Sequence, residues 1–497
     1  MAPAVSKVVV VGGGTAGWIS AALLMKVLGK VVDVTLVESD DIGTIGVGEA
    51  TIPPILSLNR VLGLDEAGFM RKTQATIKLG IQFENWGQLG NVYMHAFGQV
   101  GKDFPYCPFQ HFWLRARREG LTTDLWDYSL NFHAARQGRF GFVKQQQDMP
   151  ALAYAYHFDA GLYAKYLRAE SERMGVARVE GVIQQVRLHP ESGHVESLLL
   201  QDGQEVAGDF FIDCSGFRGL LIQEALNTGY EDWTHWLPCD RAVAVPSESF
   251  ARTVPYTRSI AHEAGWQWNI PLQHRNGNGL VYSSQHYSED EAAARLLGNL
   301  GSKALAEPRV IRFRTGRRIR QWNRNVVAVG LSSGFLEPLE STSIHLIQSA
   351  VSRLMKHFPH EGIKESEVAE YNRQSQIEFE QIRDFIIGHY HLNERSDSDF
   401  WKQCRRMSIP ASLDHKIRLF RETGKIYREQ EELFSEVAWL QVLVGQGVMP
   451  QDHHPLASAI TGASLAEMLA NVRTLVQKPL PHLATHDEFL RKYCAAD

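Results

Sequence analysis

The sequence has few cysteines, and their placement suggests neither a disulfide framework nor a zinc site. The five cysteines are scattered along the chain, and none belongs to a C-x-x-C motif. An odd, dispersed set of thiols is typical of a protein from a reducing compartment, so we expect a cytoplasmic location. No H-E-x-x-H motif and no Cys/His cluster is present either. The sequence therefore predicts no metal site.

Long apolar runs are also missing. No segment approaches the ~20 consecutive apolar residues that a membrane-spanning helix requires. The first predicted strand begins at about Lys7, which leaves no room for a signal peptide. We therefore expect no association with a membrane.

Neither sign of charge is in excess. The chain carries 51 Lys and Arg residues against 56 Asp and Glu residues, a formal net charge of −5. Proteins that bind nucleic acids usually have a high pI and a basic face, so we expect no nucleic-acid partner. With 44% hydrophobic and 22% charged residues, the composition is that of an ordinary globular protein and argues against a disordered chain.

A glycine-rich turn follows the first predicted strand and precedes a predicted helix. Its residues are Gly12, Gly13, Gly14, Thr15, Ala16 and Gly17. Such glycines let the backbone approach a pyrophosphate, which then rests on the helix N-terminus. Glu38 follows Gly17 by 21 residues, at the end of the next strand, where a carboxylate accepts hydrogen bonds from a ribose. The unit is compatible with NAD or FAD and disfavours NADP.

Two later apolar strands favour FAD over NAD. Residues 211–216 and 327–330 each run from β-branched or aromatic residues into small ones, as in flavoproteins that carry a long dinucleotide across the sheet. No second complete G-x-G-x-x-G motif follows, so no separate nicotinamide site is evident. We therefore predict an α/β fold with a Rossmann-like FAD-binding domain of the glutathione-reductase type.

The predicted FAD-binding domain is discontinuous and spans residues 1–355. It contains β-rich, substrate-facing insertions at about 85–150 and 230–310, and a mainly helical region, 356–497, follows it. The second insertion contains a predicted β-hairpin with a turn signal at Asn276 and Gly277. From about residue 343 the apolar residues recur at helical spacing.

Six motifs, in order along the chain, resemble those of the flavin-dependent tryptophan halogenase family. They occupy residues 11–18, 45–53, 156–160, 212–219, 265–271 and 334–342. The resemblance covers most of the chain up to about residue 360. Its most specific part is the W-x-W-x-I-P sequence that contains Trp266 and Trp268, taken together with the glycine-rich turn.

The resemblance implies a reaction and its two catalytic residues. In this family a separate NAD(P)H-dependent flavin reductase supplies reduced FAD, and a halide ion, bromide or chloride, is oxidised to hypohalous acid. The oxidant travels through an internal tunnel to a lysine and halogenates an aromatic ring. Lys78 matches that lysine and holds the oxidant either by a hydrogen bond or as a haloamine. Glu340 matches the glutamate that polarises the oxidant or takes the ring proton.

The resemblance also implies the cofactor, halide and substrate contacts. Beyond the glycine-rich turn and Glu38, the expected FAD contacts are Ser39, Glu49, Ala50, Val186, Leu331 and Ile344. The backbone of Thr342 and Ser343 is expected to hold the halide. Ser343 replaces a glycine that is common there, so the halide preference stays open. The substrate pocket is expected to contain His95 and Phe97 as stacking residues, with Trp266 and Trp268 between flavin and substrate.

The C-terminal region departs from the tryptophan-specific members of the family. Residues 427–434 match a segment that closes over the amino-acid part of tryptophan, but here the segment is shorter, with one tyrosine in place of a pair. A site without partners for an ammonium and a carboxylate gains little from a zwitterion that it must desolvate. We therefore expect an exposed pocket that accepts indole or an indole derivative, reacting at C3, better than free tryptophan.

Two alternatives remain open at this point. An FAD-dependent aromatic hydroxylase would reduce its own flavin with NAD(P)H, and a catalytically silent flavin-binding protein would act as a carrier or sensor. The combination of Lys78 and Glu340 argues against both, and the tryptophan motif argues against the first. A third alternative concerns Lys78 alone, which could be a solvated lysine on an exposed strand.

Overall fold

A six-stranded, mostly parallel sheet forms the upper part of the computed structural model, which describes residues 5–42, 48–122, 124–143, 151–429 and 432–495. Residues 45–47 of one halogenase-like motif lie outside the described residues. The strand order is β21 (Trp322–Asn323), β22 (Val326–Ala328), β13 (Phe210–Asp213), β1 (Lys7–Val11), β2 (Asp33–Glu38) and β9 (Ala177–Glu180). Only β21 runs antiparallel to its neighbour, β22.

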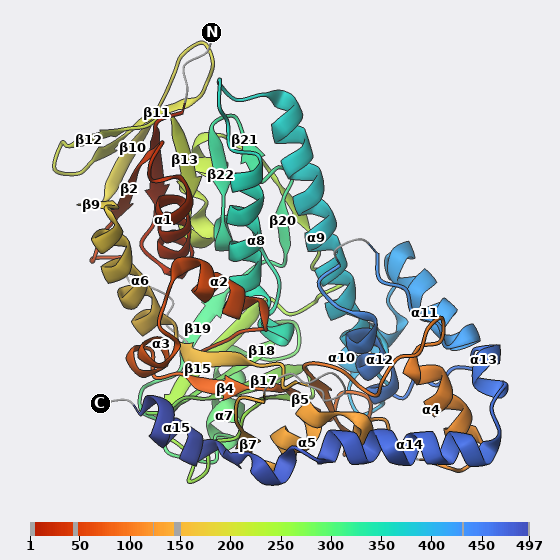
Figure 1. Ribbon diagram of the computed structural model, residues 1–497. Helices are drawn as coiled ribbons and strands as arrows, with labels where there is room; N and C mark the ends of the chain where they lie inside the picture. The colour runs from red at the N-terminus through yellow and green to blue at the C-terminus, as the bar shows by residue number, and fades with distance from the viewer. Residues whose placement is uncertain (1–4, 43–47, 123, 144–150, 430–431, 496–497) are drawn as a thin grey trace.

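The central strand β1 is buried on both of its faces, as its uninterrupted apolar sequence predicts. Val8 and Val10 belong to one hydrophobic cluster, whereas Val9 and Val11 belong to another on the opposite face. Helix α1 (Thr15–Leu28) packs over the first face between α6 (Ala160–Met174) and α8 (Ser343–Lys356) (Figure 1). The α/β fold with a Rossmann-like sheet is therefore confirmed.

A seven-stranded sheet forms the second layer. Its order is β19 (Arg309–Arg312), β15 (Arg241–Ser247), β18 (Asn276–Tyr282), β17 (Gly265–Pro271), β16 (Thr257–His262), β5 (Gly80–Glu84) and β6 (Val92–Ala96). Strands β17 and β18 form the expected hairpin, with Trp266 opposite Val281.

The turn of this hairpin does not lie where the sequence predicts it. Asn276 is the first residue of β18, opposite Pro271 on β17 and Ser247 on β15. Its side-chain Nδ2 donates a hydrogen bond of 2.7 Å to the Glu248 carbonyl. The prediction of a turn at Asn276 and Gly277 was wrong, because pairing on both sides outweighs the local turn preference of these residues.

Lys78 ends a short strand, β4 (Thr76–Lys78), that belongs to a third sheet. There β4 and β3 (Gly48–Ala50) pair with opposite edges of β8 (Ala155–Asp159). The chain then enters β5 of the seven-stranded sheet after Leu79. Packing from two sheets buries both sides of this segment, so Lys78 is 0% exposed, and the alternative of a solvated lysine is wrong.

Residues 183–207 form a separate antiparallel sheet of three strands. The strands are β10 (Ile183–Leu188), β11 (Val195–Leu200) and β12 (Glu205–Ala207). Another small sheet contains β14 (Tyr230–Asp232), β20 (Gly316–Arg318) and β23 (Gly334–Phe335), and its last strand precedes α8 in the chain.

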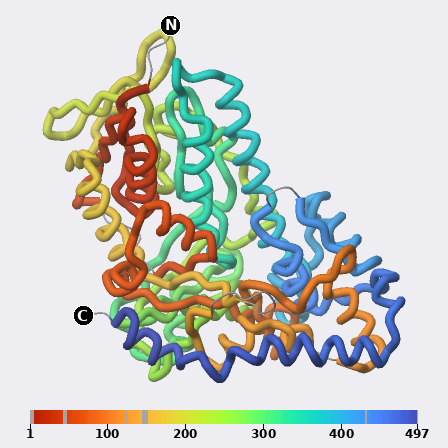
Figure 2. Tube along the Cα trace, viewed as in Figure 1, coloured from red at the N-terminus to blue at the C-terminus, as the bar shows by residue number. Residues whose placement is uncertain are grey.

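The C-terminal region is mainly helical, as expected. Helix α9 (Glu365–His391) runs for 27 residues from the nucleotide-binding layer towards the lower part of the molecule (Figure 1). It is followed by α10 (Asp399–Arg406), α11 (Ala411–Thr423), α12 (Glu436–Gly445), α13 (Pro455–Ser458), α14 (Gly462–Gln477) and α15 (His486–Cys494). The blue trace of α14 passes along α4 (Phe109–Arg118) in Figure 2, and the two helices are in contact. Among the described residues no helix is long and apolar enough to cross a membrane.

Candidate active site

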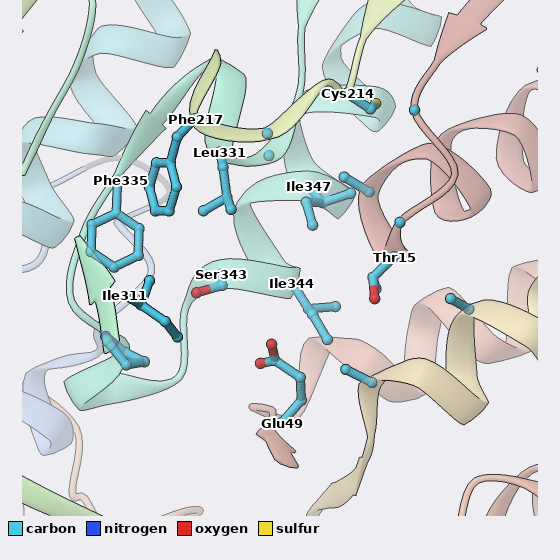
Figure 3. A pocket seen from close by; sticks show the side chains of 18 of the residues that line it. Thr15, Glu49, Cys214, Phe217, Ile311, Leu331, Phe335, Ser343, Ile344 and Ile347 are labelled. Atoms are coloured by element: carbon cyan, nitrogen blue, oxygen red, sulfur yellow. The ribbon is translucent and has the colours of Figure 1, made fainter. Parts of the chain in front are cut away.

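A cavity of about 610 Å³ opens at the carboxyl ends of β1 and β2. Figure 3 shows side chains from several elements around it, among them Thr15, Glu49, Ser343 and Ile344. Most of the expected cofactor residues line this cavity: Gly12, Gly13, Gly14, Thr15, Ala16, Glu38, Ser39, Glu49, Ala50, Leu331 and Ile344. Of the expected set, Gly17 and Val186 do not line it. Val186 lies farther along β10, and the wall there is formed by Gly181, Val182 and Ile183.

The glycine-rich turn leaves room for a ligand at one glycine and is closely packed at the others. Gly12 has φ +108°, and a Cβ there would lie 2.5 Å from the Cys214 carbonyl oxygen. A Cβ on Gly17 would lie 1.8 Å from the Gly12 oxygen, which explains why this position must be glycine although it does not face the cavity. A Cβ on Gly14 would meet no atom within 4 Å. The turn therefore fits a pyrophosphate at the start of α1.

Glu38 reaches over this turn, and two arginines hold it there. The Arg178 Nε donates a hydrogen bond of 2.7 Å to Glu38 Oε1, and Arg168 lies 3.5 Å from the same oxygen. Glu38 Oε2 occupies the space beside Gly13. Because the arginines engage the other oxygen, Oε2 is placed to accept from a ribose. Sequence reasoning missed both arginines.

The expected halide site lies at the N-terminus of α8. Ser341 has φ +59°, a left-handed conformation that redirects the chain into the helix. Ser341 and Ser343 line the cavity, and Thr342 between them is buried, with no hydrogen-bond partner for its Oγ1. The backbone N–H groups of the first helical turn have no partner within the helix and favour an anion.

Ser341 connects this cavity to Lys78, the expected catalytic lysine. The Lys78 Nζ donates a hydrogen bond of 2.7 Å to Ser341 Oγ and lies 5.3 Å from the centre of the Phe97 ring. Burial lowers the pKa of Lys78 to about 7, although the negative charge of Glu340 opposes that shift. At this pKa the side chain exists as both ammonium and amine near neutrality.

Glu340 is fully buried between two histidine rings. Its Oε2 lies 2.8 Å from His95 Nδ1, and its Oε1 lies 2.9 Å from His389 Nε2. Burial alone would raise the pKa of Glu340, but the two histidines outweigh it and bring the pKa down to about 2. The structure thus brings together Lys78, Glu340, His95 and Phe97 from the predicted site, and adds His389.

Trp266 and Trp268 line the cavity from β17. The Trp266 Nε1 donates a hydrogen bond of 2.9 Å to Glu337 Oε2, which also accepts one of 2.6 Å from Tyr390. Burial raises the pKa of Glu337 to about 7. Glu337 therefore fixes the orientation of Trp266, a contact that the family motif alone did not indicate.

The C-terminal segment reaches the site with an aromatic side chain. Phe434 is buried, stacks on Phe385 at a centroid distance of 3.7 Å, and lies 6.3 Å from the ring of His95. His95 and Phe97 are only 6% and 7% exposed. The expected exposure of the pocket is therefore wrong at these residues, because Phe434 and Phe385 cover this side. Gln430 and Glu431 lie outside the described residues.

Glu432, from the same segment, is already paired. Lys416 Nζ lies 2.8 and 2.9 Å from its two carboxylate oxygens, and Trp439 Nε1 donates a hydrogen bond of 2.7 Å to it. Glu432 is 2% exposed. Its negative charge is thus compensated within the protein.

The family model for tryptophan halogenases matches residues 7–462. The chain belongs to the tryptophan halogenase family. This halogenase is 33% identical over 528 residues to tryptophan 7-halogenase RebH of Lentzea aerocolonigenes, with 99% of each chain covered. No group of three or more possible metal ligands occurs in the described part of the chain.

Solved structures of flavin-dependent halogenases match the halogenase over its whole length. Xcc4156 from Xanthomonas campestris superposes with a TM-score of 0.97 at 49% identity, covering 100% of this chain and 99% of that one. BrvH from Brevundimonas sp. BAL3 gives a TM-score of 0.95 at 46% identity, covering 99% and 100%. The protein is therefore a flavin-dependent halogenase that uses reduced FAD, and its family relies on a separate flavin reductase.

Proposed function

We propose that this halogenase oxidises bromide or chloride and transfers the halogen to a neutral, electron-rich aromatic ring such as indole, with Lys78 and Glu340 as its catalytic residues. The position of Ser341 is the observation that carries this proposal. It lines the flavin cavity, accepts a hydrogen bond from Lys78, and directly follows Glu340 in the chain. An oxidant that leaves the cavity past Ser341 therefore meets the ammonium and the carboxylate together.

The residues that would hold FAD are the glycine-rich turn, Glu38 and the cavity wall at Glu49, Leu331 and Ile344. When bound, reduced FAD supplies the electrons with which dioxygen is activated for oxidation of the halide. The backbone at Thr342 and Ser343 would hold that halide at the start of α8, beside Ser341.

The halogen transfer balances with Lys78 as proton donor and Glu340 as proton acceptor. The O–X bond of hypohalous acid breaks with its electron pair on oxygen, and a ring carbon forms the C–X bond with a ring electron pair. Lys78 protonates the departing hydroxide, which leaves as water. The ring C–H bond then breaks, its electron pair restores the aromatic ring, and Glu340 takes the proton.

Glu432 supports the choice of a neutral substrate. A carboxylate that is to bind the ammonium of an amino acid must be free of another cation, and Lys416 already neutralises Glu432. The side chain of this segment that lies beside His95 is the apolar ring of Phe434. A zwitterion would lose its hydration at this wall without gaining ionic partners. Indole loses much less hydration than a zwitterion does, and it presents C3, its most electron-rich carbon.

The test is a reductase-coupled assay with indole and tryptophan in separate reactions, each with bromide or chloride. We expect a higher kcat/KM for indole and product halogenated at C3, identified by mass spectrometry and NMR. A clear preference for tryptophan would contradict the substrate proposal. Rapid reduction of FAD by NADH or NADPH without the reductase would instead favour a hydroxylase.

A further inference from the structure

His389 contacts the expected catalytic carboxylate but has no role in the reaction described above. It lies near the end of α9, is 0% exposed, and places Nε2 at 2.9 Å from Glu340 Oε1. His95 approaches the other oxygen from β6 at 2.8 Å. Glu340 therefore has a histidine nitrogen at each of its oxygens.

The second nitrogen of His389 determines where its protons are. Nδ1 lies 2.9 Å from the carbonyl oxygen of Phe385. A carbonyl oxygen only accepts hydrogen bonds, so Nδ1 carries a hydrogen. Nε2 and Glu340 Oε1 would repel each other at 2.9 Å if both presented lone pairs. One further proton is therefore needed on Nε2, so that an imidazolium faces the carboxylate and the pair as a whole is electrically neutral.

The ring of His389 is otherwise surrounded by aromatic side chains. It lies 4.9 Å from Phe83, 5.9 Å from Trp86 and 5.2 Å from Phe385, measured between ring centres. In such surroundings an unpaired carboxylate is costly, and a neighbouring cation strongly stabilises it.

Other ionisable groups face Glu340 from the elements packed around it. Lys78 approaches from β4 and His95 from β6, while Tyr93 on β6 is close enough for the carboxylate to contribute to the raised pKa of its hydroxyl. Only His389 lies on the helical, C-terminal side of the carboxylate among these groups. Its removal would leave Oε1 without the nitrogen that lies 2.9 Å from it.

We infer that His389 is a positioning residue whose imidazolium forms an ion pair with Glu340 and thereby keeps the carboxylate ionised and oriented to accept the ring proton. The inference rests on the proposed role of Glu340. During the reaction the ring proton passes to Glu340, whose charge is lost while His389 retains its proton. The proton then returns to Lys78, which has given one to the departing hydroxide, so charges and atoms balance over the cycle.

The test compares pH profiles of His389→Phe and the wild-type enzyme in the reductase-coupled assay with indole. We expect kcat to fall by roughly 10- to 10²-fold, as for loss of a positioned acid–base group, with little change in KM or in the oxidation of reduced FAD. Without the neighbouring cation the pKa of Glu340 rises. As the pH falls through this raised pKa, the variant should lose activity, whereas the wild-type enzyme should stay fully active.

Three further variants make the outcome decisive. His389→Gln keeps a neutral hydrogen-bond donor near Glu340 and should recover part of the rate. If thermal unfolding shows that His389→Phe does not fold, His389→Gln takes its place in the comparison. His391→Phe, on the same helix, should leave the profile unchanged. In a Glu340→Gln background, adding His389→Phe should lower kcat little further, because the effects of substitutions at coupled residues are not additive.

Three results would count against the proposals, and they separate the role of His389 from that of Glu340. A His389→Phe profile parallel to that of the wild type, or a full additional loss in the Glu340→Gln background, would overturn the role of His389. Near-normal turnover by Glu340→Gln alone would instead overturn the proposed role of Glu340.

Discussion

Lys78 Nζ and Ser341 Oγ are 2.7 Å apart, and this hydrogen bond joins the end of β4 to the loop that begins α8. Ser341 also lines the flavin cavity, whereas Lys78 does not. The serine therefore lies at the boundary between the place where the oxidant forms and the place where it is used. Ser341 has φ +59°, and this left-handed turn points the chain from Glu340 into the helix.

Lys78→Ala should abolish halogenation while oxidation of reduced FAD by dioxygen continues. The physical reason is that Lys78 acts only after the halide has been oxidised, outside the cavity wall. Halogenated product and the rate of flavin oxidation should be measured in parallel. Lys72→Ala removes an exposed lysine and should retain both rates. A normal product yield from Lys78→Ala would contradict the assignment.

The pH dependence of halogenation distinguishes the two possible roles of Lys78. Its pKa of about 7 means that the ammonium prevails below pH 7 and the amine above it. If the ammonium donates a hydrogen bond to hypohalous acid, the rate should fall as the pH rises through about 7. A haloamine mechanism requires the amine and predicts the opposite trend. Halogenation of the same aromatic by added hypohalous acid, without enzyme, corrects for ionisation of the oxidant itself.

Gly14→Ala should weaken FAD binding without disturbing the fold. A Cβ at Gly14 meets no protein atom within 4 Å, so it would project into the space that the pyrophosphate is expected to fill. We expect Kd for FAD to rise ~10-fold, or about 1.4 kcal/mol, by fluorescence titration, with an unchanged Tm. Gly298→Ala, where a Cβ also meets nothing, is the matched control. Equal affinity in both variants would contradict the predicted path of the cofactor.

Lys416→Met should destabilise the protein by leaving Glu432 buried without its cation. Breaking one side of a buried ion pair costs about 3 kcal/mol or more, which urea unfolding should detect. Lys402→Met breaks an ion pair with Asp399, which is 90% exposed, and should change the free energy of unfolding by less than ~1 kcal/mol. Adding Glu432→Gln to Lys416→Met should restore part of the loss. Similar values for the two lysine variants would argue against a compensated Glu432.

The sequence by itself determined the nucleotide-binding unit and the family. The glycine-rich turn, the strand before it and Glu38 are close in the chain, and their roles depend on backbone geometry that short sequences specify. The apolar run of β1, which fills a cluster on each face of the sheet, predicted a buried parallel strand for the same reason. Lys78 and Glu340 were identified because their motifs are contiguous.

Only the tertiary structure decided the surroundings of these residues. Asn276 became part of a strand because β15 and β17 pair with it from both sides. Lys78 is buried because two sheets meet at Leu79, and the residues next to it in the sequence do not reveal that packing. His389 is 49 positions after Glu340, Lys416 is 16 before Glu432, and Arg178 is 140 after Glu38. Side-chain contacts between distant segments depend on how whole layers pack, and no local pattern of residues encodes that arrangement.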